Sequence, residues 1–276
     1  MKRLWAFDQL VPIGLTVVVF LLLTALLAGE AWVLNYYFDA NISLHIRWYD
    51  IAIGLTIYLK TSIDFAIFIG RLMQRHTGFA SRVAIEIGTA VGNALGTLII
   101  LGLWSFFKEI RWLLAGMIVI ASLVLFRLAQ DGLEHARDVD DRYPPLFQTL
   151  VRRFESILSI INGFIAPVLR YVIPHLSVRS GTATTFWGLF AFSFSVPFIL
   201  GLDDFAGYVP LFSVVNVFGF AIGVFAGHMI LNVLLYISPD RTVSLVKNPL
   251  ISFAGSVAFV CLAVWGLYEV AHLIGF

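Results

Sequence analysis

Residues 217–236 read VFGFAIGVFAGHMILNVLLY, a run of 20 residues that contains no Asp, Glu, Lys or Arg. A membrane-spanning helix needs about 20 consecutive, mainly apolar residues, so this run matches the hydrocarbon thickness of a bilayer. Within it, glycine recurs at every fourth position, at Gly219, Gly223 and Gly227. That spacing places small residues on one helical face, a pattern typical of close helix packing in membranes. The run therefore predicts a helical membrane protein.

The rest of the chain has the same character. Hydrophobic residues make up 60% of its 276 residues and charged residues 13%, whereas soluble domains average about 45–50% and about 25%. The net charge of +1 argues against a nucleic-acid partner, which needs a strongly basic surface. Cys261 is the single cysteine, so the chain cannot form an internal disulfide or a thiolate metal centre. The lipid bilayer is the expected environment.

Seven apolar stretches are expected to span the membrane. The first follows Lys2 and Arg3, as a signal peptide would, but it stays apolar through Leu34, which favours a retained span. The stretches cover about residues 10–37, 48–73, 83–107, 112–129, 184–202, 209–236 and 250–274. The predicted organisation is an extra N-terminal helix (1–45), a three-helix repeat (46–133), a cytoplasmic segment (134–182) and a second three-helix repeat (183–276).

The distribution of Lys and Arg predicts the orientation. With the N-terminus in the cytoplasm, fourteen Lys and Arg residues fall on the cytoplasmic side and three (Arg47, Lys108 and Arg111) on the other. This asymmetry agrees with the positive-inside rule, and seven spans then place the C-terminus outside. We expect a multi-pass protein of the inner (cytoplasmic) membrane. Aromatic residues near the predicted outer ends of the spans form an interfacial belt: Trp32, Tyr36, Tyr37, Trp48, Tyr49, Trp104 and Trp112.

The longest polar region, residues 130–179, lies between the two predicted repeats. Within it, residues 147–173 carry an apolar centre of about 13 residues, at 157–169, which is short for a membrane span. We predict an amphipathic helix that lies on the cytoplasmic interface. Gly163 and Pro167 leave a re-entrant hairpin as the alternative.

Two segments of the chain resemble each other. Ser62-Ile63-Asp64-Phe65-Ala66 is followed by glycines at 88, 92 and 96, and Leu202-Asp203-Asp204-Phe205-Ala206 by glycines at 219, 223 and 227. The first triplet of spans begins outside and the second inside, so the repeats are inverted. Inverted repeats place a substrate site near the midplane, between discontinuous helices. Break signals stand beside both aspartate segments, at Thr61-Ser62 and at Pro197 and Gly201.

The aspartates of these segments are the candidate binding residues. Asp64, Asp203 and Asp204 supply three carboxylates, which together with backbone carbonyls suit a hard divalent cation such as Mn²⁺, Mg²⁺ or Ca²⁺. Lys60 precedes Asp64 by one helical turn. Two interpretations of Lys60 stay open, a local ion pair and a coupling lysine that releases a proton or fills the empty cation site. Further oxygen ligands are expected from Thr61, Ser62, Asn93 and Thr97.

Three other polar residues lie in predicted spans. His228 and Asn232 fit helix–helix hydrogen bonds, with metal ligation as the second interpretation for the histidine. Glu86 is expected near the cytoplasmic end of its span, either solvated or paired with Arg82 one turn earlier.

The aspartate segments resemble the bacterial cadmium-resistance transporters of the lysine-exporter superfamily. The family's first motif, T-N-x-D-D, is replaced here by Thr61-Ser62-Ile63-Asp64-Phe65. Its second motif, G-G-D-N followed by Y-x-P-L-F, is similar to Gly201-Leu202-Asp203-Asp204 followed by Tyr208-Val209-Pro210-Leu211-Phe212. The resemblance covers roughly residues 50–133 and 184–275, and it implies six core helices in two inverted triplets.

The departures from the family pattern concern the binding motifs themselves. Phe65 stands in place of an aspartate, Asp204 in place of an asparagine, and Lys60 is added. Membership of the superfamily is implied, but cadmium as the substrate is not. Relatives in the superfamily are associated with manganese, other divalent metals and basic amino acids.

These observations predict a secondary transporter that exports a small cation, in the first place a divalent metal ion, by alternating access. An exporter of an amino acid or another organic cation is one alternative, and a membrane scaffold that recruits a partner through its cytoplasmic segment is another. An enzyme is not expected, since the sequence offers no nucleophile–base or metal–histidine constellation. No cofactor is expected beyond the transported ion. The glycine stripes fit packing within the chain and a homodimer equally well.

Overall fold

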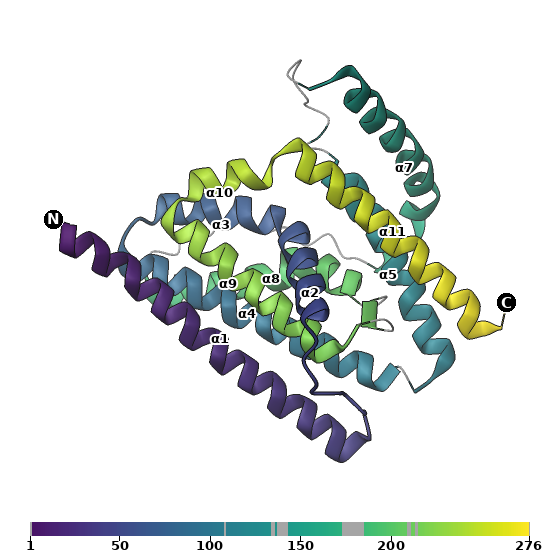
Figure 1. The fold of residues 1–276 in the computed structure, drawn as a ribbon, viewed down its shortest axis with the longest axis horizontal. Coiled ribbons are helices and arrows are strands. Elements are labelled where there is room, and N and C mark those ends of the chain that lie inside the picture. Colours follow the sequence, from purple (N-terminus) through teal and green to yellow (C-terminus); the bar gives the residue numbers. More distant parts are fainter. Residues whose placement is uncertain are drawn as a thin grey trace. The chain divides into compact units, whose positions relative to one another are not determined.

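The computed structural model describes residues 2–107, 109–133, 136, 143–172, 185–208, 211–212 and 215–275. Side chains are described for these residues apart from 2–12, 64, 106–107, 168–172, 198–207 and 246. All regular elements in the described part are helices (Figure 1). The helices are α1 (Lys2–Phe38), α2 (Trp48–Thr61), α3 (Ile63–Arg75), α4 (Phe79–Phe107), α5 (Arg111–Gly132), α7 (Pro145–Val172), α8 (Phe186–Tyr208), α9 (Val217–Ile237), α10 (Pro239–Val246) and α11 (Pro249–Ile274).

Several of these helices are long and apolar enough to cross a bilayer, so the chain has the architecture of a multi-pass membrane protein. Among the described residues there are five such segments, Ile13–Phe38, Phe79–Ser105, Arg111–Gly132, Val217–Ile237 and Pro249–Ile274. The bent pair α2 and α3 makes a sixth if it is taken as one span. In the fifth predicted stretch, 184–202, the part of α8 with described side chains is a shorter apolar helical segment, Phe186–Pro197.

The chain divides into two compact units, and the first comprises residues 1–105, 177–202 and 215–243. Its centre is α9, which is buried on nearly all faces and packs along α2 and α1. A helix that is hydrophobic all round belongs in such a central position. Helix α1 keeps an exposed apolar face, which includes Val17, Leu21 and Leu26, as a lipid-facing helix requires.

A ring of hydrogen bonds fixes the connection between α1 and α2 to the start of α9. Asp50 is fully buried and accepts hydrogen bonds from Nε of Arg47 (2.7 Å) and from the backbone N–H of Asn216 (3.0 Å). Asn216 is the N-cap of α9, where its side-chain oxygen accepts from the N–H of Gly219 (2.9 Å) and its amide donates to the carbonyl of Ser43 (2.8 Å). The hydrogen bond from Arg47 to Asp50 raises the pKa of the guanidinium.

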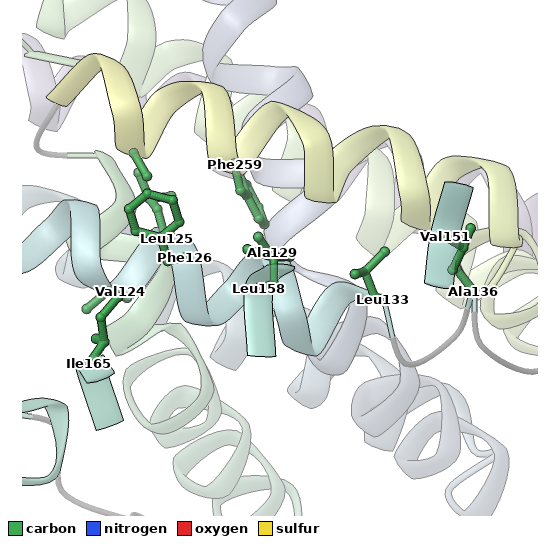
Figure 2. Packing of buried hydrophobic residues seen from close by; sticks show 11 residues of the cluster. Val124, Leu125, Phe126, Ala129, Leu133, Ala136, Val151, Leu158, Ile165 and Phe259 are labelled. Carbon is green, nitrogen blue, oxygen red and sulfur yellow. The ribbon is translucent and has the colours of Figure 1, made fainter. Parts of the chain in front are cut away.

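The second unit comprises residues 106–176, 203–214 and 244–276, and its core lies between α5, α7 and α11. Figure 2 shows this cluster, to which α5 contributes Val124, Leu125, Phe126 and Ala129, its C-cap residue Leu133 adds a fifth side chain, and α11 contributes Phe259. Helix α7 adds Val151, Leu158 and Ile165, spaced seven residues apart as in a coiled-coil seam. Two polar contacts join the same helices: Asn162 donates to the carbonyl of Phe126 (3.0 Å), and the hydroxyl of Ser252 donates to that of Gly132.

Helix α7 runs uninterrupted from Pro145 to Val172, through both Gly163 and Pro167. The re-entrant hairpin, which needs two half-helices and a turn, is therefore wrong, and the helix predicted over 147–173 is confirmed. Beside its buried face it carries a second apolar face that is exposed. That face consists of Leu146, Leu150, Ile157, Ile160 and Phe164. Such a face is what an interfacial helix needs, and its location on the membrane surface stays a prediction.

Exposed side chains also agree with the predicted aromatic belt. Trp32, Tyr36 and Tyr37 at the end of α1 are 58–69% exposed, and Trp48, Tyr49 and Trp112 at the starts of α2 and α5 are exposed as well. Cys261 is exposed on α11.

Candidate functional site

The helix break predicted at Thr61-Ser62 is present. Helix α2 ends at Thr61 and α3 begins at Ile63, with a bend of 65° between the pair. The N–H of Ser62 still donates to the carbonyl of Tyr58 (3.0 Å), and the carbonyl of Ser62 accepts from the N–H of Ala66 (2.8 Å). Ser62 itself adopts φ −82° and ψ 23°, in the sparsely populated bridge region. The backbone therefore changes direction at Ser62, and these two hydrogen bonds continue across the break.

Two of the predicted site residues are buried at this break. Lys60 is 9% exposed in the last turn of α2, and Ser62 is 1% exposed. The hydroxyl of Thr61 donates to the carbonyl of Tyr58 (3.2 Å). Asp64 belongs to the first turn of α3, but its side chain lies outside the described residues.

The second predicted break, at Pro197 and Gly201, is not seen. Helix α8 continues from Phe186 to Tyr208 with Pro197 inside it. A proline removes one helical hydrogen bond, and membrane helices tolerate this where neighbouring groups satisfy the freed carbonyl. The backbones of Asp203 and Asp204 lie on this helix, and their side chains lie outside the described residues. Among the side chains that are described, no three of His, Cys, Asp and Glu come together as a metal site.

The glycine stripes bring helix backbones into contact at two places in the first unit. On α9, a Cβ added at Gly223 would meet the carbonyl oxygen of Ile51 and, at 2.8 Å, the nitrogen of Leu55 in α2. On α4, a Cβ added at Gly88 would meet the carbonyl oxygen of Phe190 in α8 at 2.6 Å. One turn further on, a Cβ added at Gly92 would likewise overlap the carbonyl oxygen of Phe194 in α8, and one added at Gly227 would meet the ring of Tyr58 at 2.9 Å and the carbonyl oxygen of Leu55 at 3.3 Å in α2. These are therefore close contacts that only glycine allows.

The two contacts share one register. The contact residues of α8 correspond to those of α2 with an offset of 139 positions: Phe190 to Ile51, and Phe194 to Leu55. The glycines of α9 correspond to those of α4 with an offset of 135 positions: Gly223 to Gly88, and Gly227 to Gly92. Gly92 approaches the carbonyl of Phe194, and Gly227 approaches that of Leu55. The offset of 139 also relates Asp64 to Asp203, and the offset of 135 relates Asn93 to His228 and Thr97 to Asn232.

A buried chain of polar side chains connects α2, α9 and α4. His228 has no exposed surface, and its Nδ1 lies 2.5 Å from the hydroxyl of Tyr58. The amide nitrogen of Asn232 donates to Nε2 of His228 (3.0 Å) and to the hydroxyl of Thr89 (3.2 Å). The ring of Phe65, next to Asp64, lies 5.3 Å from the imidazole, centre to centre. The predicted role of His228 and Asn232 as helix–helix partners is confirmed.

The partner residues in this chain were missed by sequence reasoning. Tyr58 lies four residues before Ser62 in an apolar run, and Thr89 lies among small residues of α4, so neither has a sequence signal of its own. On α4, the equivalent pair Asn93 and Thr97 is also buried, and the Thr97 hydroxyl donates to the carbonyl of Asn93 (3.0 Å). The hydroxyl of Thr97 donates its proton within its own helix but keeps its lone pairs, so Asn93 and Thr97 both remain candidate ligands.

Glu86 differs from its prediction. It is neither solvated nor paired with Arg82, because the residue is 2% exposed and its carboxyl accepts a hydrogen bond from Thr16 of α1. The guanidinium of Arg82 donates instead to the carbonyl of Tyr236 (3.0 Å) and lies 5.6 Å from the centre of that ring. Arg82 does not pair with Glu86 because it binds the carbonyl and the aromatic ring of Tyr236 in α9.

Replacing Tyr58 with phenylalanine is expected to lower the free energy of unfolding by about 1–3 kcal/mol, because it leaves a buried imidazole nitrogen without its partner. The matched control is Tyr268→Phe on α11, since Tyr268 is hydrogen-bonded to His272 (3.1 Å) at an exposed position. Thermal unfolding in detergent measures both. Equal midpoints for the two variants would contradict the contact between Tyr58 and His228.

Comparison with known proteins does not assign the chain to a family. No family model, no curated protein and no solved structure matches the chain.

Proposed function

We propose that the protein is a secondary transporter that exports a small cation, in the first place a divalent metal ion, across the inner membrane by alternating access. The observation that carries the proposal is the break in α2–α3, which places buried Lys60 and Ser62 and the backbone of Asp64 at a bend within an apolar helix pair. Breaks of this kind in membrane helices line substrate and ion sites, because they free backbone carbonyls for coordination.

The shared register of the glycine contacts supports an inverted-repeat arrangement. In such an arrangement, the first helix of each triplet packs against the second helix of the other. The contacts of α2 with α9 and of α4 with α8 have this form, and the third helices α5 and α11 pack against each other. A repeat with this pairing is the framework on which alternating access operates in many transporters.

In this proposal, Asp64 and Asp203 bind the ion and Asp204 assists them. Thr61, Ser62 and Asn93 add oxygen ligands, and Lys60 couples ion binding to proton release or fills the empty site. A buried lysine beside carboxylates is suited to that role, since its charge state responds to its surroundings. The N-terminus lies in the cytoplasm and the C-terminus outside.

The test is the thermal stability of the purified protein in the presence of Mn²⁺, Mg²⁺, Ca²⁺, Zn²⁺, Cd²⁺, lysine or arginine, repeated on Asp203→Asn. A ligand at 100 times its dissociation constant stabilises the folded state by about 2.7 kcal/mol. We expect one divalent metal to raise the unfolding midpoint of the wild type and to leave that of the variant unchanged. Stabilisation by lysine or arginine alone would replace the metal with an organic cation. No response to any of these ligands would remove the support for a cation site.

A further inference from the structure

Glu86 is a buried carboxyl that stands apart from the aspartate segments. Glu86 lies seven residues after the first residue of α4, about 10 Å along the helix axis. One of its carboxyl oxygens, Oε1, accepts the hydroxyl proton of Thr16, while the other, Oε2, is buried and has no hydrogen-bond partner. Thr16 is the one polar residue among the nine that line an open cavity of about 330 Å³ between α1 and α9.

The surroundings of Glu86 do not compensate a negative charge. No cation among the described side chains makes an ion pair with it. Arg82, one turn earlier on the same helix, is bonded to Tyr236, and His228 on the neighbouring α9 is held between Tyr58 and Asn232. The polar groups on the nearest turns are Thr89, whose hydroxyl donates to the carbonyl of Glu86 (3.0 Å), and Asn232. A buried carboxylate in such a place is costly unless a proton or a cation neutralises it.

We propose that Glu86 is a proton-binding site of the membrane domain, in which Oε2 carries the proton and Thr16 orients the carboxyl through Oε1. A carboxylate that takes up one proton becomes a neutral acid, and the unpartnered oxygen is the atom free to hold that proton. A metal ion fits less well, because Glu86 belongs to no group of three or more metal-ligating side chains among the described residues.

The proton held by Glu86 is the coupling ion of transport. This role rests on the proposed function. Exchange of a metal ion for a proton needs a group that holds the proton inside the membrane, and Glu86 is such a group. Glu86 binds its proton in the absence of transport, so proton binding can be tested whether or not the chain moves a cation.

The test of proton binding is infrared difference spectroscopy of the protein in proteoliposomes, between neutral and alkaline buffer, a range in which solvent-exposed carboxyls stay ionised. The wild type is expected to show the C=O stretch of a protonated carboxyl, and Glu86→Gln to lose it. Thr16→Val keeps the carboxyl but removes one hydrogen bond, so it is expected to shift the same band. Glu269→Gln, on α11, is the control and leaves the band unchanged. A spectrum of Glu86→Gln identical to that of the wild type would overturn the proposal, as would a band that Thr16→Val does not move.

The test of coupling is Mn²⁺ efflux from loaded proteoliposomes, with and without an imposed pH gradient. The gradient is expected to accelerate efflux through the wild type and to lose that effect in Glu86→Gln, while exchange of Mn²⁺ at equal pH persists. If the gradient still accelerates the variant, Glu86 is not the coupling site. If the wild type moves no cation, the proposed function fails, and the infrared result still decides on proton binding.

Discussion

Replacing Asp64 or Asp203 with asparagine is expected to reduce cation transport by more than about 100-fold, with insertion and folding unchanged. Loss of a residue that merely orients a metal ligand lowers affinity by about 10–100-fold, so loss of a ligand should cost more. The amide has nearly the same size as the carboxylate, and it removes the charge without creating a cavity.

The measurement is uptake of the stabilising cation by proteoliposomes, together with size-exclusion chromatography of each variant. Asp240→Asn is the matched control, because Asp240 is an exposed carboxylate that accepts a hydrogen bond from Gln74 (2.5 Å) away from the break. We expect it to transport as the wild type does. Wild-type transport by Asp64→Asn or Asp203→Asn would remove these residues from the binding site.

Replacing Gly223 with alanine is expected to lower the free energy of unfolding by about 1–3 kcal/mol. The added methyl group would meet backbone atoms of Ile51 and Leu55, which cannot rotate away as a side chain can, and overpacking in a close-packed interior has a cost of this size. Gly92→Ala, which would meet the carbonyl of Phe194, is expected to behave in the same way.

The control for the glycine variants is Gly116→Ala in α5, where an added Cβ has nothing within 4 Å. Alanine is the better helix former by about 1 kcal/mol, so this variant is expected to be as stable as the wild type or more stable. Thermal unfolding midpoints in detergent measure the stability of all three glycine variants. If Gly223→Ala unfolds at the same temperature as Gly116→Ala, α2 and α9 do not approach at their backbones.

Much of the helical framework could be predicted from the sequence because single residues carry strong local signals. A run without charge fixes a span such as α9, and adjacent Thr61 and Ser62 mark the break that the structure contains. Proline is a weaker signal: Pro197 predicted a second break, yet α8 passes through it. Pro197 is buried against other parts of the protein, and membrane helices continue through a proline where neighbouring groups satisfy the carbonyl that it frees.

The partners of buried polar residues could not be predicted, because they come from helices far apart in the chain. Glu86 and Arg82 are one turn apart, which suggested a pair, but each bonds to another helix. Asp50 is separated from Asn216 by 166 positions, and the sequence holds no sign of their contact. The aspartate site itself stays a prediction, since the side chains of Asp64, Asp203 and Asp204 lie outside the described residues.

The exposed thiol of Cys261 makes the chain ready for spectroscopic labelling. Because Cys261 is the single cysteine, a nitroxide can be attached to it without changing the sequence. The label then reports on α11. A second cysteine in place of Ser81, at the start of α4, would give a pair for distance measurement by electron paramagnetic resonance. Distances recorded with and without the cation would then follow the movement between the two labelled helices directly.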